Sequence, residues 1–216
     1  MEKRNCLDLK YEIMTKTLKI FLVINFILLL IINIYAAEDE NKIAILVNDN
    51  VITNYDIEQR VKTFAILNQV QITSDNSGII TNKIVDELID GVLKNEKIVE
   101  YKIKVDSNDL NHYEDLYFKS RGLDRENIFE LMKINEVNKN QFYDTLYTDI
   151  AWQILIGRLY YRITSVSDIE IEELINNDPE LTRELAEKVI MDRQLALNSS
   201  KMLRDLRSEA TIEYKQ

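Results

Sequence analysis

The sequence predicts a mainly α-helical fold with one small antiparallel sheet. Glycine and proline are scarce, with four glycines and one proline in 216 residues, and this composition favours long helices joined by short connections. Apolar residues recur at helical spacing over most of the chain, as expected for amphipathic helices that share a core. Two short apolar segments near the ends of the chain, residues 43–47 and 211–214, have strand character instead.

Residues 1–37 have the features of a secretory signal peptide. Lys16 and Lys19 precede an almost wholly apolar stretch over residues 20–32, and Ala36-Ala37 offers a small-residue cleavage site. The sequence therefore predicts export to the periplasm by a cleavable signal, with residues 38–216 as the exported part.

Two alternatives concern this leader. Met14 is a second possible start, because it stands just before the two lysines of the basic region. An uncleaved inner-membrane anchor is the alternative to cleavage, although the apolar stretch is short for a membrane span of ~20 residues.

Charge and cysteine content restrict the partners and the means of stabilisation. The full chain has a formal net charge of −10, and because the leader carries +2, residues 38–216 carry −12. This acidic balance argues against nucleic acid as a partner, since binding phosphates requires a basic surface. The single cysteine, Cys6, lies in the leader, so the exported part has no disulfide and depends on its hydrophobic core.

The first element after the leader is predicted to be a β-hairpin. Residues 43–47 form an apolar strand, and Asn48-Asp49-Asn50 supplies a turn whose residues tolerate left-handed backbone angles. Val51-Ile52 returns as the second strand. Thr53 and Asp56 then fit a capping box at the start of a helix over residues 55–70.

Two helices are expected to follow a polar loop at residues 74–78. Residues 80–101 give the clearest amphipathic pattern, with a broad apolar face. Asp106 or Ser107 caps the next helix, which runs to about Arg121. Gly122 fits the left-handed position just past its end.

The next two helices differ in character. Asp124 caps a short helix that ends near Met132, and Asn138 caps a long one over residues 141–162. From Ala151 onward the long helix is apolar on most sides, which is typical of a helix enclosed by others. We therefore expect it to lie at the centre of the fold.

The last part of the chain is predicted to contain two helices and a strand. Ser167 and Glu170 form a capping box for the first helix. Pro179 fits the first turn of the last helix, over residues 180–207. The terminal segment, residues 211–214, is predicted to be a short strand.

The segment KIAILVNDNVITNYDIEQR, residues 42–60, resembles the opening of the SurA family of periplasmic chaperones. Residues 84–89, 101–106 and 162–171 are similar to further family segments, so this first resemblance extends to about residue 175. It resumes over residues 202–214, which look like the family's C-terminal helix and strand, with Met202 in the place of a tryptophan.

The resemblance implies a SurA-type chaperone core as one domain over residues 38–216. Residues 38–178 would form its N-terminal part, and residues 179–216 the helix and strand that complete the same core. In the family the last strand pairs with the first and closes the core, so the resemblance implies that residues 211–214 pair with residues 43–47.

The parvulin-type prolyl isomerase modules of the family have no counterpart here. They would be inserted between Ile175 and Arg183, and they require histidine-bearing strands and glycine-rich loops. The single histidine is His112, and no glycine follows Gly157. Isomerase activity is therefore not expected, and we predict that the protein is not an enzyme.

No pattern of residues predicts a catalytic or metal site. His112 stands in the sequence Asn-His-Tyr-Glu-Asp, but one histidine without cysteine or a second histidine is a poor zinc site. Carboxylate pairs such as Asp86-Glu87 and Glu114-Asp115 fit solvated helix faces better than catalysis. Phosphate-binding, dinucleotide and serine-hydrolase fingerprints are absent from the sequence. We expect no cofactor and no small-molecule substrate.

Aromatic residues and methionines are the candidate peptide-binding residues. Tyrosine is common where proteins bind partners, and methionine adapts to varied surfaces. The alternative for each of these side chains is packing in the core. The candidates are Tyr113, Tyr117, Tyr143, Tyr147, Tyr161, Met132 and Met202.

The function that the resemblance implies is an ATP-independent periplasmic chaperone. Its partners would be unfolded outer-membrane or exported polypeptides and, beyond them, the outer-membrane assembly machinery. Two alternatives stay open at this point: an adaptor or structural protein with the same fold that binds one folded partner, and, less in keeping with the missing modules, a prolyl isomerase.

Overall fold

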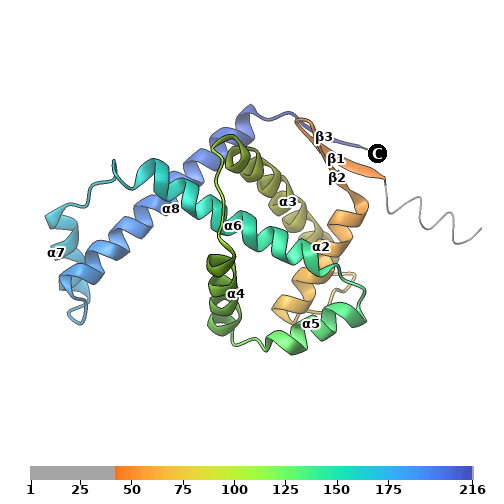
Figure 1. Cartoon of the computed structure of the whole chain (residues 1–216), viewed down its shortest axis with the longest axis horizontal. Helices are drawn as coiled ribbons and strands as arrows, with labels where there is room; N and C mark the ends of the chain where they lie inside the picture. The colour runs from red at the N-terminus through yellow and green to blue at the C-terminus, as the bar shows by residue number, and fades with distance from the viewer. Residues whose placement is uncertain (1–41, 216) are drawn as a thin grey trace, which may run out of the picture. The chain divides into compact units, whose positions relative to one another are not determined.

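The computed structural model describes residues 42–215. Within that range it contains seven helices and three short strands, so the predicted mainly α-helical fold is confirmed (Figure 1). The predicted leader, residues 1–37, lies outside the described residues. Ile43–Ile52 and Asp56–Gln216 make up one compact unit. The elements are β1 (Ile43–Val47), β2 (Asn50–Thr53), α2 (Asn54–Asn68), α3 (Ser77–Glu100), α4 (Ser107–Arg121), α5 (Arg125–Ile134), α6 (Lys139–Tyr160), α7 (Asp168–Asn177), α8 (Arg183–Glu209) and β3 (Ile212–Tyr214).

The three strands form one sheet in the order β2-β1-β3. β3 runs antiparallel to β1, with Val47 opposite Ile212 and Ile45 opposite Tyr214. The predicted pairing of the first and last strands is therefore confirmed. Ile45 and Val47 are buried against α3, because alternate side chains of β1 face the core.

Asn48 joins the hairpin turn to both the C-terminal strand and α3. Its backbone lies in the left-handed region, at φ 51°, where asparagine is tolerated. The N–H of Asn48 donates to the carbonyl of Thr211 at 2.8 Å, and the N–H of Thr211 donates to Oδ1 of Asn48 at 3.0 Å. The side-chain amide of Asn48 donates to the carboxylate of Glu96 on α3 at 3.0 Å. That carboxylate also accepts from the amide of Asn50 at 2.7 Å.

Helix α6 is the central helix, as predicted. It packs against α3, α4, α5 and α8 (Figure 1). Ala151, Trp152 and Leu155 are buried on it, and the indole N–H of Trp152 donates to Oγ of Ser199 on α8 at 2.8 Å. The one polar atom of this large side chain is therefore satisfied inside the core.

Side-chain caps fix the start of each helix from α4 to α8. Asp106 accepts from the N–H of Asn108, Asp124 caps α5 and Asn138 caps α6 in the same manner. Ser167 and Glu170 form the predicted capping box of α7. Gly122, at φ 62°, ends α4 in the predicted left-handed conformation.

The predicted start of the last helix is wrong by three residues. Pro179 lies in a turn before α8, where Oδ1 of Asp178 accepts from the N–H of Glu180 at 3.2 Å. Helix α8 begins at Arg183, because the hydroxyl of Thr182 accepts from the N–H of Leu185 and satisfies its first turn. The start of α8 is therefore set by the Thr182 cap, and not by Pro179 in the first helical turn.

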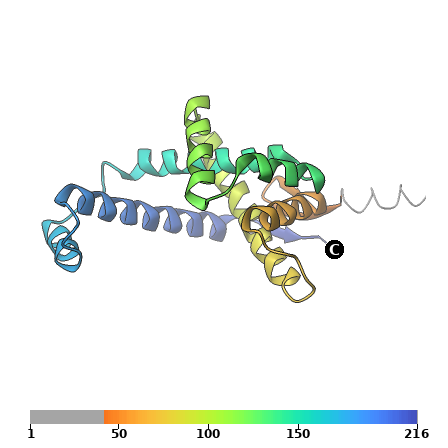
Figure 2. The ribbon, with the colours of Figure 1, turned by 90° about the horizontal axis from the view of Figure 1, so that it is seen from below.

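The two halves of helix α8 pack against different helices. Its first half packs on α7 through Ala186 and Ile190, which enclose Ile171. Its second half packs on α3 and α6 through Leu203 and Leu206 (Figure 2). The chain then enters β3, so the position of this second half is linked to the sheet.

Replacing Asn48 by alanine tests the connection between the two ends of the chain. The variant loses the side-chain bonds to Thr211 and Glu96 and places a less tolerant residue in the left-handed region. Because these bonds are solvent-exposed, we expect the free energy of unfolding to fall by about 1–2 kcal/mol in urea titrations. Asn48→Gly keeps the left-handed backbone angle accessible, so its free energy of unfolding should fall by less. Equal stability of Asn48→Ala and the parent chain would contradict this role.

Candidate functional site

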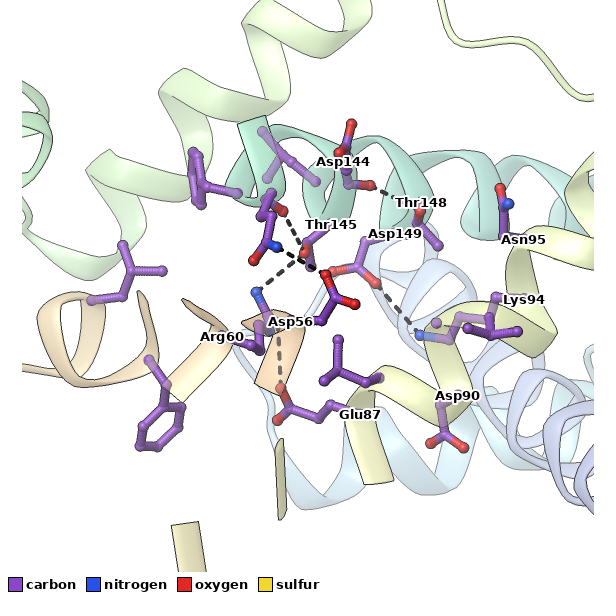
Figure 3. Close-up of a pocket in the computed structure, with 18 of the residues that line it drawn as sticks. Asp56, Arg60, Glu87, Asp90, Lys94, Asn95, Asp144, Thr145, Thr148 and Asp149 are labelled. Atoms are coloured by element: carbon purple, nitrogen blue, oxygen red, sulfur yellow. Dashed lines mark hydrogen bonds and ion pairs between the residues drawn. The ribbon is translucent and has the colours of Figure 1, made fainter. Parts of the chain in front are cut away.

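A groove of about 690 Å³ lies among α2, α3 and α6 and reaches the C-terminal end of α4 (Figure 3). Its lining combines apolar and charged side chains. The larger apolar residues are Val51, Ile52, Phe64, Leu67, Leu88, Val92, Tyr117, Phe142 and Leu146. The charged residues are Asp56, Arg60, Lys83, Glu87, Asp90, Lys94, Arg121, Asp144 and Asp149. Sequence patterns did not single out this set, because its members come from four separate helices and one strand.

Arg60 connects the three helices that form the groove. From α2, its Nη1 donates to the hydroxyl of Thr145 on α6 at 3.2 Å, and its Nη2 donates to the carboxylate of Glu87 on α3 at 3.3 Å (Figure 3). The Arg60 side chain is only 19% exposed. A planar guanidinium with two partners in a partly buried site has a fixed position. This residue therefore sets the spacing of the three helices.

A second ion pair joins α3 to α6 across the groove, and a third joins α3 to α8 on its outer side. Nζ of Lys94 on α3 lies 3.4 Å from the carboxylate of Asp149 on α6. Asp90 also lines the groove, and its carboxylate accepts from Nη1 of Arg207 on α8 at 3.1 Å. Burial raises the pKa of Asp90, while Arg207 and Lys94 act in the opposite direction. Arg207 pairs with Asp86 as well, so α8 is held to the outer side of α3.

Gln59 holds the loop that leads into α6. The side chain is 4% exposed, its Nε2 donates to the carbonyl of Glu136 at 3.3 Å, and its Oε1 accepts from the N–H of Asn138 at 2.7 Å. Glu136 has a left-handed backbone, at φ 55°. A buried amide with both ends satisfied specifies one loop conformation. Sequence reasoning missed Gln59, because a single glutamine within a helix carries no local signal of burial.

Three of the predicted tyrosines use their hydroxyl groups to connect neighbouring elements. The Tyr143 hydroxyl donates to the buried carboxylate of Glu114 at 3.0 Å. Tyr113 accepts from the side chain of Gln153 at 3.0 Å, and Tyr147 accepts from the N–H of Val105 at 3.4 Å. These contacts join α4 and the loop before it to α6. The structure therefore gives these three residues positions in the packing between elements.

Tyr117 lies at the meeting point of two hollows. It lines the groove, and with Tyr113 it lines a second hollow on α4. Its ring makes edge contacts with Phe118 and Phe142, at centroid distances of 5.5 Å in both cases. Burial raises the pKa of the Tyr117 hydroxyl, although nearby Arg121 and Arg60 act to lower it.

The other predicted binding residues do not join the groove lining. Met132 on α5 is 1% exposed, enclosed in a core cluster with residues of α2, α4 and α6. The prediction that it contributes to a surface is therefore wrong. Its apolar neighbours enclose it as a gap-filling core residue. Met202 is half-buried against the core cluster that contains Trp152. Tyr161 is 60% exposed just beyond α6.

The described residues offer no metal site and no membrane-spanning helix. Histidine, cysteine and acidic side chains nowhere gather in a group fit for a metal ion between residues 42 and 215. His112 is exposed on α4. Over the same range, the helices lack the combination of length and apolar character that crossing a bilayer requires.

Comparisons with known proteins identify the fold. The sequence matches no family model and no curated protein. The structure is similar to a solved chain from work on PEB4 and Cj1289 of Campylobacter jejuni, which are a virulence factor and a periplasmic protein and are described there as structurally related SurA-like chaperones. The TM-score is 0.50 at 12% sequence identity, and the alignment covers 82% of this chain and all of the other. This chain therefore has a SurA-like fold.

The Tyr143–Glu114 bond predicts a specific dependence of stability on pH. Desolvation and the bond to Glu114 raise the pKa of Tyr143 from 10.0 to about 12. The unfolded chain therefore loses this proton first, and the stabilisation is complete below pH 10.0 and is lost as the pH rises toward 12. Tyr143→Phe removes the bond, so we expect a loss of about 1.5 kcal/mol near neutral pH.

The comparison of Tyr143→Phe with the parent chain in urea titrations isolates this group from the other tyrosines. The difference in unfolding free energy should be largest near neutral pH and should shrink above pH 10.0, the ordinary tyrosine pKa. A difference that stayed constant to the highest accessible pH would contradict the assignment.

Proposed function

We propose that this protein is a chaperone that binds unfolded segments of exported polypeptides in the groove among α2, α3 and α6, without ATP. The groove, with its mixed apolar and charged lining, is the observation that carries the proposal. The likeness to SurA-like chaperones, which extends over all of the compared chain, and the signal-like leader of the sequence support it.

The apolar lining suits client side chains that a folded protein would bury. Phe64, Leu88 and Val92 are partly buried and remain in contact with the hollow. Burying one large apolar side chain of a client contributes about 1.5–3 kcal/mol. Ordering an unfolded segment and losing its translational freedom offsets much of that gain. Binding by a few such contacts is therefore weak and reversible, and release needs no nucleotide.

The charged lining keeps the groove accessible to solvent, and the ion pairs within it maintain its shape. Arg60 with Glu87 and Lys94 with Asp149 are paired within the protein. A client that covers these pairs does not leave an unpaired buried charge, which would be costly. The pairs also hold α2, α3 and α6 at a fixed spacing, so an extended segment meets a preformed surface.

A groove-wall variant tests this proposal. Phe64 lies on α2, and Nζ of Lys83 lies 4.8 Å from the centroid of its ring. Phe64→Gln should weaken binding of an unfolded outer-membrane protein roughly five- to thirtyfold, because about 1–2 kcal/mol of apolar contact is lost. The readout is the amount of chain needed to halve aggregation after dilution from urea.

Ile169→Gln is the matched control. Ile169 is 76% exposed on α7 and does not line the groove. This variant should protect the client as well as the parent chain does. If the parent chain neither suppresses aggregation nor crosslinks to the unfolded client, the proposal fails. A single stoichiometric complex with one folded protein, and no affinity for unfolded segments, would favour the adaptor alternative.

A further inference from the structure

We propose that Arg121, whose guanidinium lies over the Tyr117 ring where the two hollows meet, selects client segments that carry a carboxylate next to an apolar side chain. This inference rests on the proposed function and assigns a substrate class to the same groove. It concerns the one basic side chain of the groove that has no ion pair within the described part of the chain.

The four basic side chains of the groove differ in their partners. Arg60 and Lys83 both approach Glu87, at 3.3 and 3.8 Å, and Lys94 approaches Asp149 at 3.4 Å. The guanidinium of Arg121 makes no ion pair or hydrogen bond to another residue of the described range 42–215. An unpaired cation at the edge of a preformed hollow is available to a ligand anion.

Arg121 is nevertheless held in place. Its guanidinium carbon lies 4.3 Å from the centroid of the Tyr117 ring, which is the geometry of a cation–π contact. This contact restrains the position of the guanidinium, and its N–H donors have no acceptor among residues 42–215. A carboxylate matches these donors with two parallel hydrogen bonds. Restraint before binding lowers the entropic cost of recognition.

The surroundings of the pair require an apolar neighbour on the ligand. Tyr117 contacts Phe142, and both line the groove beside Leu67. The same tyrosine lines the second hollow with Leu116, which is 48% exposed. A carboxylate bound to Arg121 therefore places the adjoining side chain of the ligand against aromatic and aliphatic surface.

The remaining charges set the direction of the ligand. Asp144 on α6 lines the groove without a cationic partner among residues 42–215. A ligand carboxylate is repelled from Asp144 and attracted to Arg121. Salt screens the net negative charge of the rest of the chain beyond about 10 Å, so distant charges contribute little to the binding of the ligand. The local pairing with Arg121 therefore decides the preference between similar segments.

The carboxylate can come from a chain terminus or from an aspartate or glutamate side chain. Three labelled peptides of one apolar sequence distinguish these sources by fluorescence anisotropy with the full chain. One ends in a free carboxylate, one is amidated, and one is amidated but carries an aspartate beside the apolar residues. We expect one or both acidic peptides to bind about three- to fivefold more tightly than the neutral amide.

Variants locate the preference. Arg121→Gln should bring the acid-to-amide affinity ratio to about one, and Arg121→Lys should retain only part of it because lysine lacks the planar fork. Lys188→Gln removes the same charge from an exposed site on α8 outside both hollows, so its affinity ratio should equal that of the parent chain.

Two results would overturn the inference while leaving the proposed function intact: equal affinity of the parent chain for acidic and neutral peptides, or an unchanged preference in Arg121→Gln. If none of the peptides binds and the parent chain also fails to suppress aggregation of an unfolded outer-membrane protein, the inference and the proposed function both fail.

Discussion

The antiparallel pairing of β1 with β3 is the constraint on which the rest of the structure depends. It brings two segments separated by nearly the whole described chain into one sheet, with Asn48 bonded to Thr211 and Glu96 at their junction. Because β3 directly follows α8, this pairing directs the second half of α8 onto α3 and α6. Arg207 then bonds to Asp90, which lines the groove on α3. The groove is therefore supported from its outer side by the end of the chain.

The groove itself is built from groups that satisfy one another. Arg60 links three helices, and Lys94 with Asp149 adds a second link between α3 and α6. These charges lie near partners, so their partial burial at the groove carries no large unpaired desolvation cost. Aromatic residues at its α4 end contact one another edge to face and stabilise that side by packing. The proposed binding surface is thus preformed, which suits a chaperone that binds weakly and repeatedly.

The sequence alone predicted the elements well, because their signals are local. Asp124, Asn138 and Ser167 cap helices by contacts within a few residues, and the apolar stretch after Ala151 indicates the central helix. The pairing of the first and last strands came from the family resemblance, since short strands far apart have no local register signal. The start of α8 was misplaced because Thr182 and Pro179 both fit the beginning of a helix.

The candidate site was predicted only in part. Tyrosine content indicated a partner surface, and of the predicted residues Tyr117 lines the groove. Periodicity cannot tell that Met132 is enclosed or that Tyr143 bonds to Glu114, because both facts depend on how α4, α5 and α6 pack. The charged lining could not be predicted for the same reason. In the sequence, Arg60, Glu87 and Asp149 each look like ordinary charged residues on a solvent-facing side of a helix.

Amide hydrogen exchange of the chain, with and without an unfolded outer-membrane polypeptide, tests the central claim most directly. If the groove is the binding surface, the client should slow exchange in the parts of α2, α3 and α6 that line it, around Phe64, Leu88 and Asp149. Exchange in α7 and in the first half of α8 should stay unchanged. Slower exchange confined to α7 and α8, with none at the groove, would contradict the account.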